Sequence, residues 1–478
     1  MRKGSRDYIA NRSTTFSSYQ NAIKRFSPSA LLPILAGITA RLEPQNYSAQ
    51  PDYERSAPWA FAGVARDSLL YGDLGANTTP TENSVARLYG RYSNVVDFSR
   101  KTPMAEVITP LAYEQFPFQE SVFSEMARVS ALLGPRAGRI TWDWSVVLGL
   151  PLDNAVRAAM VLHAWAVNNG GKYDPSILDL PHFQDVFDRI APRREIELLA
   201  KRFTTTVVDA RENFESSVAG DSLRRKYALN PLGSKPLVDL GQLGIWAPVA
   251  AMIPRALSVA NLYYLAAEAW GAEFTNDLGL RTEEYVGEQL GLVSGVQLHP
   301  EIVYKIGKNE RKSVDWIWVH KEAVVLIESK SARLSRPGHT DSQAMAKSTS
   351  QYLVSARRQI DVTAGLIRGR AAGFAHLPVD RPIIGVVLTS EPFYLGNSTL
   401  PEYGAKSETP SIVVSLRELE QLVCYPADLS VPHLVRLANG TGGLTWSVSN
   451  TFKDFPEPSR NAILDAAFRR YDFAASEL

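Results

Sequence analysis

Three ionisable residues in one short stretch have the types needed for metal chemistry: Asp315, Glu328 and Lys330. They lie in the stretch 313–330, SVDWIWVHKEAVVLIESK, which is rich in β-branched and aromatic residues. This pattern predicts two short strands joined by a tight turn at 321–322. If the strands pair symmetrically about that turn, Asp315 faces Glu328. Side chains alternate between the two faces of a strand, so Lys330 shares the face of Glu328.

Two directly opposed carboxylates are expected to destabilise a hairpin, because their like charges lie only about 5 Å apart at Cβ. A hard divalent cation held between the oxygens is the simplest remedy, and carboxylate oxygens are the ligands that Mg²⁺ prefers. The spacing therefore predicts a site for Mg²⁺ or Mn²⁺ on Asp315 and Glu328. The structural alternative is that Lys330 bridges the two acids and no metal binds.

The other face of the predicted hairpin is apolar. We expect this apolar face to lie in a core and the Asp/Glu/Lys face to lie on the opposite side of the hairpin. Both strands contribute to the apolar face, through Val314, Trp316, Trp318, Val325 and Ile327.

An Asp, a gap of about a dozen residues and then Glu-x-Lys on the next strand resembles the motif of the PD-(D/E)XK nuclease superfamily, which has the restriction-endonuclease-like fold. The matching positions are Asp315, Glu328 and Lys330. No Pro precedes Asp315, a departure that is frequent in the superfamily. The resemblance covers the C-terminal half of the chain and implies a mixed β-sheet flanked by helices.

Members of this superfamily usually have a helix before the hairpin that donates a further Glu, and RTEEYVGEQLGLV (281–293) supplies such a helix. Glu283 shares the apolar face of Val286 and Leu290 at helical spacing, so we expect it to point inward. Glu284 is expected on the solvent-exposed face.

The resemblance implies metal-dependent hydrolysis of phosphodiester bonds, with DNA favoured over RNA and endonuclease action favoured. It implies that Asp315, Glu328, Glu283 and the carbonyl of Ser329 hold the metal and that Lys330 orients a water or offsets developing charge. A helix over 341–360 often lays a Gln toward such sites, with Gln351 the first choice and Gln343 the second. Basic residues would attract the nucleic-acid backbone: Lys305, Lys308, Arg311, Lys312, Arg333 and Arg336.

Composition sets the wider frame. The chain has 478 residues, which predicts two or three domains, and 45% hydrophobic with 21% charged residues is typical of a globular protein. A net charge of +1 neither favours nor excludes nucleic acid as a partner.

The one cysteine, Cys424, excludes a disulfide framework and a thiolate zinc site. The N-terminus lacks a signal-peptide pattern and apolar runs are short, which predicts a cytoplasmic protein without a membrane span.

The predicted organisation is α+β or α/β. A mostly helical region would be followed by the nuclease-like sheet, with elements in the order helix–strand–strand–strand–helix–strand–strand–helix. The predicted units are a helical region at 1–270 with a flexible basic arm at 1–25, a nuclease-like domain at 271–425, and a helical extension at 426–478. A polar loop is expected at 271–279 and a basic loop at 305–312.

The helical region contains no chemical motif. It could sense a signal, recruit a partner protein or form a homo-oligomer. A nuclease-like domain joined to such a region is typical of bacterial genome-defence and DNA-processing proteins, which is an analogy at the level of domain arrangement. The alternative function is a catalytically inactive nuclease-like module that binds nucleic acid or a protein partner.

Overall fold

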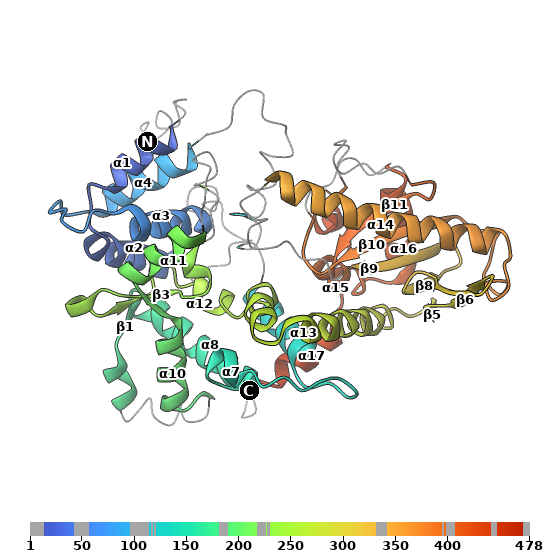
Figure 1. Ribbon diagram of the computed structural model, residues 1–478, viewed down its shortest axis with the longest axis horizontal. Coiled ribbons are helices and arrows are strands. Elements are labelled where there is room, and N and C mark those ends of the chain that lie inside the picture. The colour runs from blue at the N-terminus through green and yellow to red at the C-terminus, as the bar shows by residue number, and fades with distance from the viewer. Residues whose placement is uncertain are drawn as a thin grey trace.

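The protein combines helices and mixed sheets, with most helices in the first half of the chain and the largest sheet in the second (Figure 1). A computed structural model describes residues 14–42, 57–95, 114–115, 118, 121–180, 190–217, 226, 230–330, 342–393, 396–397, 407–440 and 447–471. The coarse prediction of a helical region followed by helices and a mixed sheet is confirmed.

The chain begins its described part with four packed helices: α1 (Phe16–Ile23), α2 (Pro28–Leu42), α3 (Pro58–Tyr71) and α4 (Glu82–Ser93). Thr15 caps α1 by accepting a hydrogen bond from the Ser18 amide, and α1 buries Phe16, Tyr19 and Ile23 on one face. The predicted flexible arm is therefore wrong for residues 16–23, because its aromatic residues recur at helical spacing. Residues 1–13 of that arm lie outside the described part.

A second group of helices and a small sheet follow. The helices are α6 (Val122–Leu133), α7 (Ser145–Leu148), α8 (Leu152–Asn168), α10 (Arg193–Phe203), α11 (Val207–Ser217) and α12 (Met252–Arg255). The four short strands are paired in the order β1-β4-β3-β2 and consist of β1 (Lys172–Tyr173), β2 (Thr204–Thr206), β3 (Leu237–Asp239) and β4 (Ile245–Trp246). This sheet was not predicted, because strands of two or three residues have no readable alternation.

One described stretch, Ser145–Asn168, is by length and composition apolar enough to cross a membrane. In this structure its longer helix, α8, packs in the main core through residues that include Val156, Leu162 and Trp165. The core helix of a globular protein passes the same test, so the location of the protein stays a prediction.

The long helix α13 (Val259–Leu290) joins the two halves of the chain. The loop predicted at 271–279 is wrong, because the helix continues through it and buries Phe274, Leu278 and Tyr285 at helical spacing. Only Gly271 departs from helical geometry, with φ 62° and ψ −142°, a conformation that residues with a Cβ avoid. The expected boundary is thus a kink within a helix.

The main sheet has five strands in the order β11-β10-β9-β8-β5. They are β5 (Gln297–Pro300), β8 (Trp316–Val319), β9 (Val324–Lys330), β10 (Ile383–Thr389) and β11 (Ser411–Ser415). β8 is antiparallel to both of its neighbours, whereas β9, β10 and β11 run parallel. Apart from the added pair β6–β7, these strands and their helices follow the predicted order.

Helices cover both faces of this sheet (Figure 1). One face packs on α14 (Ser342–Arg368), which buries Leu353, Ala356 and Ile360 against it. The opposite face packs on α13, α15 (Leu416–Leu422) and α16 (Ala427–Ala438), while α17 (Ala462–Arg469) lies against α6. Because both faces are covered, β10 is buried along its whole length, and its residues up to Leu388 carry no polar side chain.

Between β5 and β8 the chain forms a separate two-stranded ribbon, β6 (Val303–Ile306) and β7 (Asn309–Lys312). The basic loop expected at 305–312 is therefore wrong, since most of these residues form two paired strands. Gly307, with φ 61°, forms the turn of the ribbon.

The ribbon and the main sheet meet at an irregularity in the strand pairing. Pro300 pairs with Trp316 and Val303 pairs with Lys312, so two residues on one side oppose three on the other. This is the pattern of a β-bulge, here near Val314. Val314 consequently packs with the α14 face and not with Trp318, which corrects the predicted apolar face at that one position.

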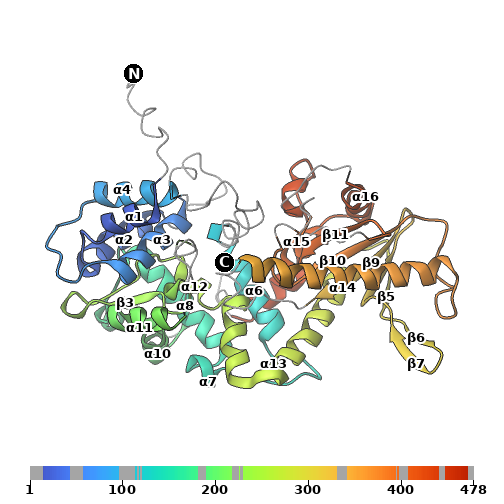
Figure 2. The same ribbon diagram turned by 45° about the horizontal axis from the view of Figure 1, so that its top comes forward.

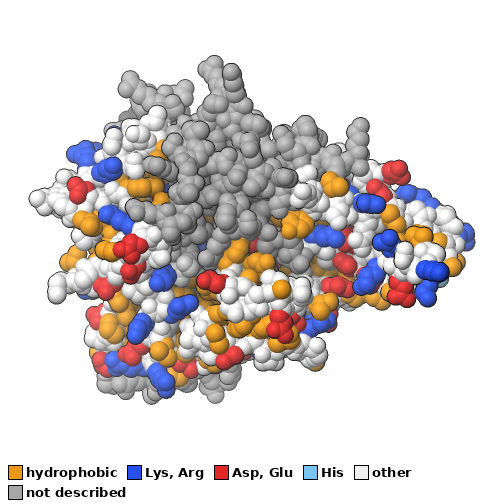
Figure 3. All heavy atoms as spheres, in the orientation of Figure 1, with side chains coloured by type: hydrophobic (Ala, Val, Ile, Leu, Met, Phe, Trp, Pro, Cys, Tyr) orange, Lys and Arg blue, Asp and Glu red, His pale blue; other side chains and the backbone are white. Residues whose placement is uncertain are grey.

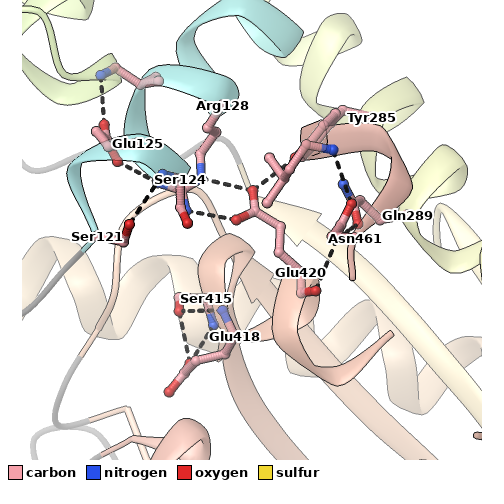
Figure 4. Close-up of polar contacts among 12 residues, drawn as sticks. Ser121, Ser124, Glu125, Arg128, Tyr285, Gln289, Ser415, Glu418, Glu420 and Asn461 are labelled. Atoms are coloured by element: carbon pink, nitrogen blue, oxygen red, sulfur yellow. Dashed lines mark hydrogen bonds and ion pairs between the residues drawn. The ribbon is translucent and has the colours of Figure 1, made fainter. Parts of the chain in front are cut away.

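A buried polar network fixes α13 to the elements around it (Figure 4). Arg128 of α6 donates two hydrogen bonds to the Glu420 carboxylate of α15, at 2.7 and 2.6 Å. The Tyr285 hydroxyl of α13 donates to the same carboxylate at 2.8 Å. The network joins the helical half of the chain to the sheet, and Tyr285 lies two residues from Glu283.

Candidate metal-binding site

The strand pairing of the central hairpin brings Asp315 and Glu328 together. Trp316 pairs with Ile327 and Val319 with Val324, which is the symmetric register about 321–322 that the sequence predicts. The Ser329 amide donates a hydrogen bond of 2.6 Å to Oδ2 of Asp315. The Asp315 side chain therefore lies against the end of β9, beside Glu328.

Lys330 shares the face of Glu328 and contacts it. Its Nζ lies 2.5 Å from Oε1 of Glu328, with the lysine side chain 22% exposed and the glutamate 3% exposed. Oε2 of Glu328 is buried and accepts no hydrogen bond within the described part of the chain. A buried carboxylate oxygen without a partner is unfavourable, so this atom marks a place where a ligand would be stabilised.

Burial and, to a smaller extent, the negative charge of Asp315 raise the pKa of Glu328 to about 7, although Lys330 acts in the opposite direction. Burial also raises the pKa of Asp315, which the hydrogen bond from Ser329 and the charge of Lys330 oppose. Both carboxylates are thus held in a setting that penalises two negative charges. A proton or a cation between them would relieve that penalty.

The preceding helix presents Glu283 to the same place. The indole Nε1 of Trp316 donates to the Glu283 carbonyl at 3.1 Å. A Cβ at position 287 would lie 2.2 Å from the Trp316 ring, so only glycine lets α13 approach the strand this closely. Burial, then the charges of Asp315 and Glu301, raise the pKa of Glu283.

Glu284 points elsewhere, as the helical phase predicts. Its carboxylate pairs with Arg139 at 2.5 Å and with Arg136 at 3.3 Å, on the outer side of α13. Of the two glutamates, Glu283 is the one whose pKa the charge of Asp315 raises.

Glu301 is an acidic residue of the site that the sequence did not reveal. It follows β5 directly and lies opposite the bulge near Val314, and its charge raises the pKa of both Asp315 and Glu283. Its side chain forms an ion pair with Lys312 at 2.8 Å. A sequence signal existed, because Glu301 directly follows β5 and Asp315 directly precedes β8. It could be recognised only once the pairing of β5 with β8 was known.

The predicted glutamine is not brought to this site. Gln351 is exposed on α14, and the side chain of Gln343 lies outside the described part. Other residues of α14 hold the bulge instead. Gln359 donates to the Ser313 carbonyl at 2.7 Å, and Oγ1 of Thr363 accepts from the Val314 amide at 3.1 Å.

β10 adds one further polar group that the sequence did not single out. Thr389 pairs in register with Lys330, and its hydroxyl is buried without a hydrogen-bond partner among the described residues. In-register neighbours on parallel strands share a face, so this hydroxyl and Oε2 of Glu328 are two unsatisfied oxygens on the same side of the sheet.

The donors present fit a hard divalent ion better than a soft one. Asp315, Glu328 and the Ser329 carbonyl could supply oxygen ligands, and Asp315 is close enough for its charge to act on Glu283. Within the described ranges no three His, Cys, Asp or Glu side chains stand together as a complete metal-ligand set. Such an ion would therefore depend on backbone, water or substrate oxygens as well.

Comparisons with family models, with curated proteins and with solved structures find no match for this chain.

Proposed function

We propose that this protein is a metal-dependent phosphodiesterase that cleaves nucleic acid, with DNA the favoured substrate. The observation that carries the proposal is Oε2 of Glu328, which is buried opposite Asp315 without a hydrogen-bond partner among the described residues, with Lys330 on the same face. Acidic oxygens and one ammonium at a strand end form a set that could hold a cation and offset charge on a phosphate.

The arrangement of elements supports a restriction-endonuclease-like fold. The helix that carries Glu283 is followed by three strands, β5, β8 and β9, each antiparallel to the next. Helix α14 then connects β9 to the parallel strands β10 and β11. The strands follow one another across the sheet in chain order, with helices on both faces. This is the arrangement that the resemblance implies.

Asp315, Glu328 and the carbonyl of Ser329 would hold Mg²⁺ or Mn²⁺, with Glu283 acting directly or through water. The bound ion would lower the pKa of a water and polarise the phosphodiester. Lys330 would orient the attacking water or offset negative charge that develops at phosphorus. A role in genome defence or DNA processing would follow from the domain arrangement alone.

The test is cleavage of plasmid, linear duplex, single-stranded DNA and RNA with Mg²⁺ and with Mn²⁺. Asp315→Ala should abolish both cleavage and stabilisation by Mn²⁺. Lys330→Ala should lower cleavage by about 10²- to 10³-fold, because one group that stabilises transition-state charge is removed. Mn²⁺ stabilisation should survive, since an ammonium is not a ligand.

Lys321→Ala is the matched control, because Lys321 lies on the turn of the same hairpin and pairs with Asp428. It should cleave like the wild type. If Asp315→Ala and Lys330→Ala also cleave like the wild type, the nuclease proposal fails. A wild type that binds nucleic acid without metal and never cleaves it would support the inactive binding module instead.

A further inference from the structure

The β6–β7 ribbon is a surface element that, for most of its length, has no structural partner among the described residues. Its two strands pair only with each other, and it is closed at its base by the bonds Ser313 N–H to Ile302 O (3.0 Å) and Ile302 N–H to Ser313 Oγ (2.8 Å). Figure 2 shows it standing out from the main sheet near β5. Its position is therefore set by its base, while its tip reaches into solvent.

The ribbon is strongly basic. It carries four cationic residues against one acid, Glu310, and all five are exposed: Lys305, Lys308, Arg311, Lys312 and Glu310. Lys308 and Arg311 form no ion pair with any described residue, whereas Lys305 lies 4.0 Å from Glu310. Lys and Arg side chains gather at the end of the molecule where Figure 1 labels β6 (Figure 3).

Exposed apolar residues accompany this charge. Val303 and Ile306 are 57% and 59% exposed. Tyr304 is the exception, because its ring packs edge-on against Phe374 at 5.6 Å between centroids. One aromatic contact thus supports the ribbon, while its remaining side chains are available to a partner.

The base of the ribbon touches the candidate site. Lys312 pairs with Glu301 at 2.8 Å, and this hydrogen bond, with smaller effects from the charges of Glu283 and Asp315, raises the pKa of Lys312. A partner gripped by the ribbon would therefore lie next to the carboxylates. A ribbon that acted far from the candidate site would not need the ion pair between Lys312 and Glu301.

We infer that the β6–β7 ribbon is a duplex-binding element that enters the major groove of B-form DNA. A two-stranded ribbon fits this groove, which is about 12 Å wide, and its cations would replace counterions on the flanking phosphates. The exposed Val303 side chain, on the face opposite to Tyr304, would contact base edges such as thymine methyl groups. The inference rests on the proposed function and narrows its substrate to duplex DNA.

The same geometry argues against double-stranded RNA. The major groove of an A-form helix is deep and too narrow for side chains to read. A ribbon that acts by groove entry should therefore discriminate between the two duplexes, whereas simple charge attraction should not.

The test compares two double variants with the wild type. Lys308→Ala/Arg311→Ala removes two charges near the tip of the ribbon, and Lys24→Ala/Arg25→Ala removes two exposed charges from the turn between α1 and α2. Affinity for one DNA duplex and one RNA duplex of equal length is measured in EDTA by fluorescence anisotropy over a range of salt concentrations. Melting temperature with and without Mn²⁺ is recorded for each variant.

The ribbon variant should bind the DNA duplex at least about tenfold more weakly, and its salt slope should fall by about 2 because two phosphate contacts are lost. Its Mn²⁺-induced stabilisation should be unchanged, since no ligand is altered. The control variant should bind DNA like the wild type. The wild type should bind the RNA duplex more weakly than DNA.

The inference is overturned if the ribbon variant binds DNA like the wild type, or if both variants lose affinity equally. It is also overturned if the wild type binds neither duplex, or binds both equally. These outcomes are separate from failure of the nuclease proposal. A protein that binds DNA through the ribbon but never cleaves it would retain this inference and lose the catalytic one.

Discussion

Two buried glutamates in this protein have opposite surroundings. Glu420, whose side chain is 4% exposed, receives two hydrogen bonds from Arg128 and one from Tyr285. Both of its oxygens are satisfied by a bidentate ion pair, the strongest common arrangement for a buried carboxylate. Figure 4 shows how three helices converge on this one group.

Glu328 is equally buried, with 3% of its side chain exposed, but the protein leaves it incomplete. Lys330 contacts one oxygen, the other has no partner within the described residues, and a second carboxylate stands opposite. Both carboxylate oxygens of Glu420 thus accept hydrogen bonds, whereas one oxygen of Glu328 accepts none from the described residues. The difference indicates that the Glu328 site is arranged for something added from solution, which in our proposal is a divalent cation.

The largest expected effect on stability comes from breaking the ion pair between Arg128 and Glu420. Arg128→Ala would leave the Glu420 carboxylate buried without its cation, so we expect the free energy of unfolding to fall by about 3–5 kcal/mol. Urea denaturation of the metal-free protein followed by circular dichroism would measure this loss.

A double variant separates the charge from the packing. Arg128→Met/Glu420→Leu removes both charges of this pair and should recover part of the lost stability, because Glu420 no longer leaves an unpaired buried charge, although Glu125 loses its ion pair with Arg128. If Arg128→Ala costs less than about 1 kcal/mol, the contrast between the two glutamates is not real. Cleavage and Mn²⁺ binding by the double variant should remain, since neither residue belongs to the proposed site.

A smaller effect of opposite sign is expected at the incomplete site. In the metal-free protein Glu328→Gln should raise the free energy of unfolding at pH 8, by on the order of 2 kcal/mol, because it removes one of two opposed negative charges. The same change should abolish stabilisation by Mn²⁺. Thermal melts with EDTA and with Mn²⁺ would show both effects.

The pH dependence has a definite direction. The folded-state pKa of Glu328, about 7, lies above its ordinary value of 4.5, so between these values the folded state holds a proton that the unfolded state has lost. Wild-type stability should therefore fall as the pH rises through this window and level off above it. Glu328→Gln should flatten that fall, and an unchanged pH profile would contradict the assignment.

Asp361 provides a control of the opposite sign. Its carboxylate accepts hydrogen bonds from the Ser407 hydroxyl and the Thr409 amide, each at 2.8 Å, and hydrogen bonds of this kind hold its pKa below the ordinary value although burial acts in the other direction. Asp361→Asn should therefore lower stability near neutral pH. That loss should shrink as the pH falls below the usual range of an aspartate, because the wild-type contribution then disappears.

The hairpin could be predicted from sequence because its signals are local. Register followed from symmetry about 321–322, and strand alternation placed Lys330 beside Glu328, as the structure shows. The inward phase of Glu283 followed from its apolar neighbours three and seven residues along the helix. These are all relations within about 50 residues of chain, set by backbone geometry alone.

What could not be predicted depended on contacts distant in sequence or on irregular backbone. Val314 changes face because of a bulge, which no alternation pattern reveals, and Glu301 joins the site only through pairing of β5 with β8. Gln351 was placed by analogy, and the apolar phase of α14 turns it outward. The partners of Glu420 come from α6 and α13, so sequence gave no sign of that network.

The smallest expected effects distinguish two neighbouring glutamates on α13. Glu283→Gln should weaken stabilisation by Mn²⁺ several-fold without abolishing it, because Asp315 and Glu328 would still hold the ion. Glu284→Gln should leave Mn²⁺ binding unchanged and should cost less than about 1 kcal/mol, since its ion pairs with Arg136 and Arg139 lie at the partly exposed surface. Melting temperature against Mn²⁺ concentration measures both variants in one experiment. If the two substitutions weaken Mn²⁺ stabilisation equally, the Glu283 side chain does not point to the site. Asp315 and Glu328 would then lack the helix carboxylate that the proposal assigns to them.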